Sequence, residues 1–129
     1  MSTMSFHSYQ IKGKGVGTSD VVPTINLAIP SSLDLPFGVY AARVILEDKL
    51  GKKQYNGALH FGPRPTDQDP SSSLELHILD AQQFDTDYNA EEIDVEIVQF
   101  IREIRTFDNF AQLRDQIQKD IVKIQEVLG

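Results

Sequence analysis

The sequence predicts a mainly β fold, a small closed barrel of about six short strands with one amphipathic helix packed outside or across it. Two observations lead to this prediction. Short segments with strand patterning alternate with turns up to residue 104, and residues 110–128 then repeat apolar side chains at helical spacing. A length of 129 residues fits a single domain covering residues 1–129.

Six segments carry strand patterning. In chain order they are Phe6–Lys12, Thr24–Ile29, Gly38–Leu46, Gln54–Phe61, Ser73–Leu79 and Ile93–Ile104. The fifth is the clearest, because leucine and isoleucine alternate with Glu75 and His77 and so predict one buried and one polar face. The turn Asp48–Gly51 makes the third and fourth segments a hairpin, and residues 62–72 have loop composition. Alternation fails near Gln99, where we expect a bulge or bend.

The last expected element is a helix. Its apolar side chains recur at steps of three and four residues, which is the spacing of one helical face, at Phe110, Leu113, Ile117, Ile121, Ile124 and Leu128. Asp108 is the expected N-cap, because its carboxylate can accept from the free N–H groups of the first turn. Gly129 follows at the expected end.

Composition and charge exclude several classes of protein. Zero cysteine excludes disulfides and thiolate metal sites and agrees with the cytoplasm as the expected location. A net charge of −7 argues against a nucleic-acid partner. The sequence contains no run of about 18 apolar residues, so we expect no membrane span. The charge is uneven. Residues 1–63 hold six basic and four acidic side chains, whereas residues 64–129 hold six basic and fifteen acidic, so an anionic ligand is expected at the N-terminal half.

The segment Gly13–Thr18 is the most unusual local feature. Gly13, Gly15 and Gly17 alternate, which would let backbone N–H groups approach a phosphate without hindrance from side chains. It is neither a Walker A loop nor a dinucleotide-binding fingerprint. A glycine-rich β-turn with no ligand is the alternative from this segment alone.

Two further places could carry chemistry. Thr24 and Asn26 are two residues apart on an expected strand, so both oxygens point the same way, an arrangement that suits Mg²⁺. Glu75 lies in the middle of an alternating strand and could act as a general base if it faces a pocket. The alternative for Thr24, Asn26 and Glu75 is that they lie on an ordinary solvent-exposed face of their strands. The three histidines lack zinc-ligand spacing.

Taken in order, these segments resemble the riboflavin kinase (flavokinase) family, in particular the kinase module of bacterial bifunctional FAD synthetases. The motifs that carry the resemblance are Gly13–Thr18, Pro23-Thr24-Ile25-Asn26, Gly38-Val39-Tyr40, Gly62-Pro63-Arg64-Pro65-Thr66, Glu75-Leu76-His77, Ile101-Arg102-Glu103 with Phe107-Asp108, and Gln116–Ile121. Each motif is short, but their order and spacing match over about residues 9–127.

The resemblance implies a six-stranded antiparallel Greek-key β-barrel with a C-terminal helix. It also implies an ATP:riboflavin 5′-phosphotransferase that makes FMN from riboflavin and ATP, with ADP as the other product. The glycine segment, ending at Gly17 and Thr18, would cover the nucleotide phosphates. Thr24 and Asn26 would hold Mg²⁺, Glu75 would take the proton of the ribityl 5′-hydroxyl, and Arg102 would lie on the flavin side.

Some positions depart from the family pattern. Thr18–Val22, with an acidic Asp20, stands where a basic residue and Leu-Gly-Phe are common; His60 replaces a common Asn, and Asp87-Tyr88-Asn89 replaces Leu-Tyr-Gly. We expect a working, monomeric kinase without an adenylyltransferase domain, since 129 residues leave no room for one. The alternatives are a non-catalytic flavin- or nucleotide-binding barrel and a translation-factor-like barrel that contacts other proteins.

Overall fold

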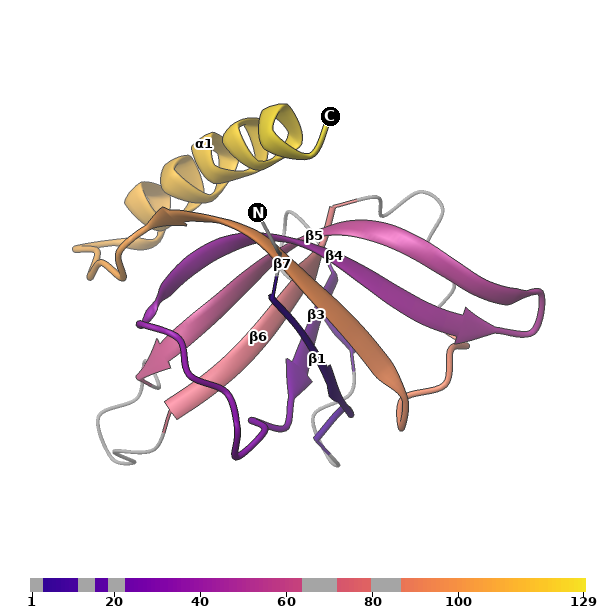
Figure 1. Cartoon of the computed structure of the whole chain (residues 1–129). Helices are drawn as coiled ribbons and strands as arrows, with labels where there is room; N and C mark the ends of the chain where they lie inside the picture. The colour runs from indigo at the N-terminus through magenta and orange to yellow at the C-terminus, as the bar shows by residue number, and fades with distance from the viewer. Residues whose placement is uncertain (1–3, 12–15, 19–22, 64–71, 80–86) are drawn as a thin grey trace.

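The computed structural model describes residues 4–11, 16–18, 23–63, 72–79 and 87–129; for 16–18 and Pro23 only the backbone is described. Within these ranges it contains seven strands and one helix (Figure 1). They are β1 (Met4–Ser8), β2 (Val16–Thr18), β3 (Pro23–Leu27), β4 (Gly38–Asp48), β5 (Gly51–Pro63), β6 (Ser72–Ile78), β7 (Ile93–Arg102) and α1 (Phe110–Leu128).

The strands form one antiparallel sheet in the order β1-β7-β4-β5-β6-β3-β2. The last strand, β7, returns to lie between β1 and β4, which is the crossover expected of a Greek key. The sheet curls so that the residues after β1 meet β3: Gln10 bridges Leu27, Ile11 N donates to Asn26 O at 2.9 Å, and Ala28 N donates to Tyr9 O at 2.9 Å. The expected antiparallel barrel with a C-terminal helix is therefore confirmed.

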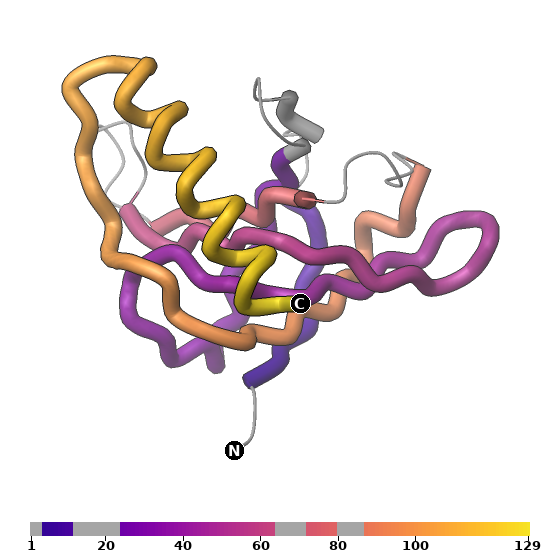
Figure 2. Tube along the Cα trace, turned by 90° about the horizontal axis from the view of Figure 1, so that it is seen from above, coloured from indigo at the N-terminus to yellow at the C-terminus, as the bar shows by residue number. Residues whose placement is uncertain are grey.

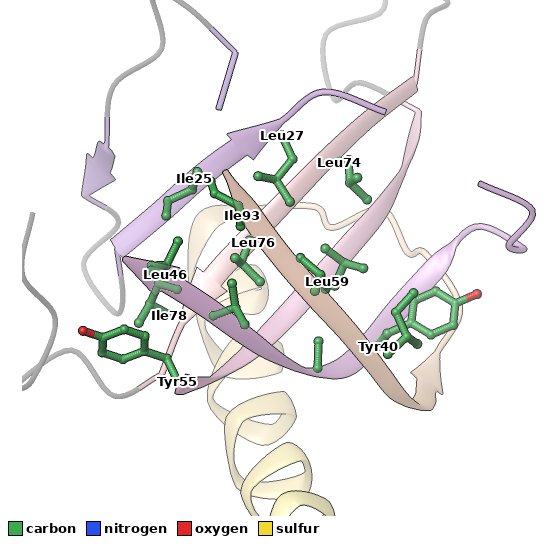
Figure 3. Packing of buried hydrophobic residues seen from close by; sticks show 14 of the residues in the cluster. Ile25, Leu27, Tyr40, Leu46, Tyr55, Leu59, Leu74, Leu76, Ile78 and Ile93 are labelled. Carbon is green, nitrogen blue, oxygen red and sulfur yellow. The ribbon is translucent and has the colours of Figure 1, made fainter. Parts of the chain in front are cut away.

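The barrel interior holds the main core. Its members come from the inward-facing positions of all the long strands, and Ile25, Leu27, Val44, Leu59, Leu76, Ile78, Ile93 and Val95 are fully buried (Figure 3). Because side chains alternate along a strand, the residues between these positions point outward. On β6 the alternation of buried and half-buried residues follows the sequence pattern directly, so Glu75 and His77 lie on the outer face.

A second, smaller core lies outside the barrel, beneath α1. Ile124 and Leu128 of the helix pack with Val39, Ala41 and Ala58 of β4 and β5. Figure 2 shows the helix crossing over these strands. This cover explains why the first half of β4 reads as a continuous apolar run rather than an alternating one, because that part is buried on both faces.

The hairpin between β4 and β5 agrees with the sequence. Asp48 pairs with Gly51, so two residues form the loop, and Gly51 has a φ of 115°, a conformation that favours glycine. The backbone N–H of Leu50 donates to Asp48 Oδ1 at 2.8 Å, which closes the turn. The expected irregularity in β7 is also present. Register shifts occur on both sides of the pairs that Gln99 and Phe100 make with β4.

Three details differ from the sequence predictions. The helix N-cap is Asn109, not Asp108: its side chain accepts from Gln112 N at 2.9 Å. Part of the glycine segment, expected as a turn, is the short strand β2. The expected strand Phe6–Lys12 is divided, with β1 ending at Ser8 before the separate bridge at Gln10.

Candidate active site

A row of polar residues crosses the outer face of the barrel from β3 toward α1. Asn26 of β3 is paired with Glu75 of β6, and Glu75 is paired with His60 of β5. His60 is in turn paired with Val39, and Val39 with Arg102 of β7. Directly opposite residues on an antiparallel pair have Cβ atoms about 4.5–5.5 Å apart, so Asn26, Glu75 and His60 are direct neighbours, while the apolar Val39 separates His60 from Arg102.

Thr24 and His77 form a second pair beside this row. They are partners in the β3–β6 register, and Thr24 Oγ1 lies 3.1 Å from His77 Nδ1. Burial lowers the pKa of His77, while the carboxylate of Glu75 partly opposes the shift. The ring is therefore neutral near pH 7, and one of its nitrogens is a hydrogen-bond acceptor.

The donor set on β3 fits Mg²⁺. The hydroxyl of Thr24 and the amide oxygen of Asn26 are hard, neutral ligands on one face, both half-buried. Within the described ranges, no three His, Asp or Glu side chains are grouped to hold a metal. A cation held by Thr24 and Asn26 could take phosphate oxygens and water as its remaining ligands, as Mg²⁺ commonly does.

Two buried polar atoms near Glu75 have no hydrogen-bond partner among the residues that the structure describes. One is His60 Nδ1 on the neighbouring strand, and the other is Ser73 Oγ, two residues before Glu75 on the same face of β6. Burial lowers the pKa of His60, Glu75 opposes this shift, and Arg102 adds to it. Unpartnered buried polar atoms cost free energy, so this part of the face is suited to a polar ligand that satisfies them.

Arg102 is held by the helix. Its Nε donates to both carboxylate oxygens of Asp120, at 2.9 and 3.0 Å, and its Nη2 donates to Asp120 Oδ2 at 2.8 Å. Gln116 Nε2 also donates to Asp120 Oδ1 at 2.9 Å. The Arg102 and Asp120 side chains are only 15% and 8% exposed, so this bidentate pair fastens α1 to β7.

The structure describes part of the glycine segment. Gly13 and Gly15 lie outside the described residues, as does Asp20. The backbone of β2 pairs Gly17 with Thr24 and Thr18 with Pro23. The end of the glycine segment therefore runs alongside the strand that carries Thr24 and Asn26.

The structure thus brings Thr24, Asn26 and Glu75 together on β3 and β6, with Gly17 and Thr18 beside them. Arg102 belongs to the same row but at its far end, and its role toward a flavin stays a prediction. Asp120 and Ser73 were not anticipated from the sequence. Asp120 had a signal, because it lies three residues after Ile117 and four before Ile124, within the buried stripe of the helix.

The fold and the site define the class of this protein. It is a small antiparallel β-barrel with an outer helix, and one face of the barrel carries hydroxyl, amide and carboxylate groups. Comparison with known proteins then gives the family. The family model described as "Flavokinase: Riboflavin kinase" matches residues 2–128, nearly the whole chain. The chain belongs to the riboflavin kinase family.

The relatives agree. The bifunctional riboflavin kinase/FMN adenylyltransferase of Haemophilus influenzae is 32% identical over 111 residues, which cover 86% of this chain and 34% of that protein. The enzyme of the same name from Bacillus subtilis is 30% identical over 85% of this chain and 34% of that protein. This chain spans about a third of the length of these two relatives.

Two other similar proteins have different descriptions. The RNA-binding riboflavin kinase RibR of Bacillus subtilis is 31% identical over 86% of this chain and 45% of that protein. A crystal structure described as a macrolide-efflux protein from Streptococcus pneumoniae has a TM-score of 0.69 and 25% identity, covering 92% of this chain and 37% of that one. This second likeness supports the fold. No helix among the described residues is long and apolar enough to cross a membrane.

Proposed function

We propose that this chain transfers the γ-phosphoryl group of ATP to the ribityl 5′-hydroxyl of riboflavin, giving FMN and ADP. The observation that carries the proposal is the pairing of Asn26 with Glu75, with Thr24 and His77 as the next pair on the same face. A candidate cation site and a candidate base are thereby neighbours on adjacent strands.

The residues divide the chemistry between them. Thr24 and Asn26 would hold Mg²⁺, which when bound would supply charge neutralisation for the phosphates. The backbone of Gly17 and Thr18 is paired with β3 and would therefore lie near the phosphates of a nucleotide bound at Thr24 and Asn26. These groups hold the γ-phosphoryl group in line with the incoming hydroxyl, and positioning of this kind is the main task in phosphoryl transfer.

Glu75 is the base. As the 5′-oxygen of riboflavin forms its bond to the γ-phosphorus, the bond from phosphorus to the leaving ADP oxygen breaks and the hydroxyl proton passes to the Glu75 carboxylate. His60 and Ser73 each have a buried polar atom without a partner among the described residues, and these atoms would bind polar groups of the substrate near the reacting hydroxyl.

The assay is direct. The purified chain is incubated with riboflavin, Mg²⁺ and ATP, and FMN is separated by chromatography and detected by its fluorescence. We expect FMN well above the level without enzyme, and parallel reactions with GTP and CTP give the nucleotide preference. Riboflavin binding without FMN from any of the three nucleotides would instead identify a non-catalytic flavin-binding barrel.

A further inference from the structure

The hydrogen bond between Thr24 and His77 joins the candidate cation site to its neighbouring strand. The two residues are register partners, and Oγ1 lies 3.1 Å from Nδ1. On the other side of His77 the register partner is Ala58 of β5, which has no polar side chain to compete for the ring. The side-chain hydrogen bond of the imidazole joins its Nδ1 to the threonine hydroxyl.

The direction of this hydrogen bond matters for a cation. A threonine hydroxyl has one proton and two acceptor lone pairs. If the hydroxyl accepts from the ring, one lone pair is used and its own proton must point elsewhere. If the hydroxyl donates to Nδ1, the proton is fixed on the histidine side and both lone pairs face away from it, toward a cation.

We propose that His77 is a positioning residue: its Nδ1 accepts a hydrogen bond from the Thr24 hydroxyl and thereby directs the oxygen lone pairs of Thr24 toward the cation that accompanies the nucleotide. The inference rests on the proposed function of the same face. Residues that hold a metal ligand in place in this way typically change metal affinity by about 10- to 100-fold when they are replaced.

The test measures cation binding without turnover. Mn²⁺ is the probe, since it takes the oxygen ligands that suit Mg²⁺ and its free form is counted by electron paramagnetic resonance. Mn²⁺ is titrated into the protein with ADP present. We expect His77→Phe, which keeps a ring but removes the acceptor, to weaken Mn²⁺ binding by about 10- to 100-fold.

Two further variants separate positioning from a structural role. In His77→Asn the amide oxygen can occupy nearly the place of Nδ1, so we expect Mn²⁺ affinity within about threefold of the parent. His7→Phe is the matched control, because His7 is exposed on β1 and pairs with Asp94 at 2.7 Å, outside the polar row. It should leave Mn²⁺ binding unchanged.

The inference is overturned if His77→Phe binds Mn²⁺ as tightly as the parent, or if His77→Asn loses as much affinity as His77→Phe. It is also overturned if the parent protein binds no Mn²⁺ with ADP. Should His77→Phe fail to fold, His77→Gln replaces it, because its longer side chain carries the amide past the Nδ1 position and the same loss is expected. Parent protein that binds Mn²⁺ with ADP but forms no FMN would refute the proposed kinase activity and leave the positioning role intact.

Discussion

The register of β6 with its two neighbouring strands determines which residues surround Glu75. Its partners on both sides are polar, Asn26 on β3 and His60 on β5, although β6 itself alternates strictly between apolar and polar residues. A carboxylate in such a row has neighbours that can bind a substrate hydroxyl and hold it within reach.

Replacing Glu75 with Gln removes the proton acceptor and keeps the size of the side chain. We expect kcat to fall by about 10²–10⁴-fold with little change in the KM for riboflavin, the usual effect of losing a positioned base. Steady-state FMN formation measures both constants. Glu92→Gln, an exposed carboxylate just before β7, is the control and should be neutral. Near-normal kcat in Glu75→Gln would remove this residue from the mechanism.

Replacing Asn26 should weaken Mg²⁺ binding rather than proton transfer. In Asn26→Ala one oxygen ligand is lost while Thr24 remains, so we expect the Mg²⁺ concentration for half-maximal FMN formation to rise by about tenfold or more. The measurement is a Mg²⁺ titration at saturating ATP and riboflavin. Asn56→Ala, on β5, is the matched amide control. A Mg²⁺ dependence unchanged by Asn26→Ala would contradict the assigned ligand.

At the scale of elements, α1 is fastened to the barrel by both apolar and ionic contacts. Ile124 and Leu128 supply the buried area, Asp120 receives the bidentate Arg102, and Arg43 Nη2 donates to Leu128 O at 3.1 Å near the helix C-terminus. The polar row on the sheet therefore continues into the helix. Val39 of β4 is the register partner of both His60 and Arg102. A shift of the helix would therefore move Arg102, which lies two strands from His60.

Asp120→Ala tests that connection. The substitution leaves the guanidinium of Arg102 largely buried without its carboxylate, which costs about 3 kcal/mol when an ion pair of this kind is broken from one side. Urea unfolding measures the change in free energy. Asp115→Ala, exposed on the same helix, should change stability by less than about 0.5 kcal/mol. Equal effects of the two variants would mean that the Arg102 pair contributes nothing to docking.

The first turn of the helix provides a test of the revised N-cap. Gln112 N donates to the Asn109 side chain, and Asp108 N donates to Gln112 Oε1 at 3.2 Å. Asn109→Ala should destabilise the protein by about 1 kcal/mol, because an N–H of the first turn loses its acceptor. Asp108→Ala should have a smaller effect in the same urea titration. A larger loss of stability in Asp108→Ala than in Asn109→Ala would identify Asp108 as the N-cap instead.

Local patterns predicted the elements well, and pairings between distant residues less so. The alternation around Glu75 and the helical spacing up to Leu128 are local, and both elements are present. The pairing of Asn26 with Glu75 joins segments far apart in the chain, so only the family resemblance pointed to it. The strand β2 has three residues and a central glycine, too short for a pattern and poor in β-propensity. Asp108 and Asn109 are both good caps, so the sequence could not choose between them.

At the scale of the whole molecule, the net charge is the basis for expecting no nucleic-acid partner. One relative is described as RNA-binding, but the net charge here is −7, and the C-terminal half is the acidic one. Binding to RNA in the absence of base-specific contacts depends on basic residues that replace counterions. The expectation of no nucleic-acid partner therefore stays a prediction for this chain.

Acidification should destabilise the whole fold in two separate ranges. Burial lowers the pKa of His60 and of His77 below the ordinary value of 6.5, so as pH falls through 6.5 the unfolded chain takes up protons that the folded protein does not. The hydrogen bond from Leu50, with Lys53, lowers the pKa of Asp48 below 3.8. A further loss of stability is thus expected below that value, when the unfolded carboxylate becomes protonated first.

The range below pH 6.5 is the more informative one, because His60 and His77 lie in the candidate active site. We expect the free energy of unfolding in urea to be lower at about pH 5.5 than at about pH 7.5, with the difference reduced in the double variant His60→Asn/His77→Asn, which has no imidazole to protonate. The charged groups that act on the His60 ring are Glu75, Arg102 and Asp120, and those that act on the His77 ring are Glu75, Asp120 and His60 itself when protonated. His7→Asn is the control for the third histidine. If the parent and the double variant lose the same stability between the two pH values, then the buried imidazoles are not the groups whose protonation opposes folding, and the polar row is more open to water than its burial indicates.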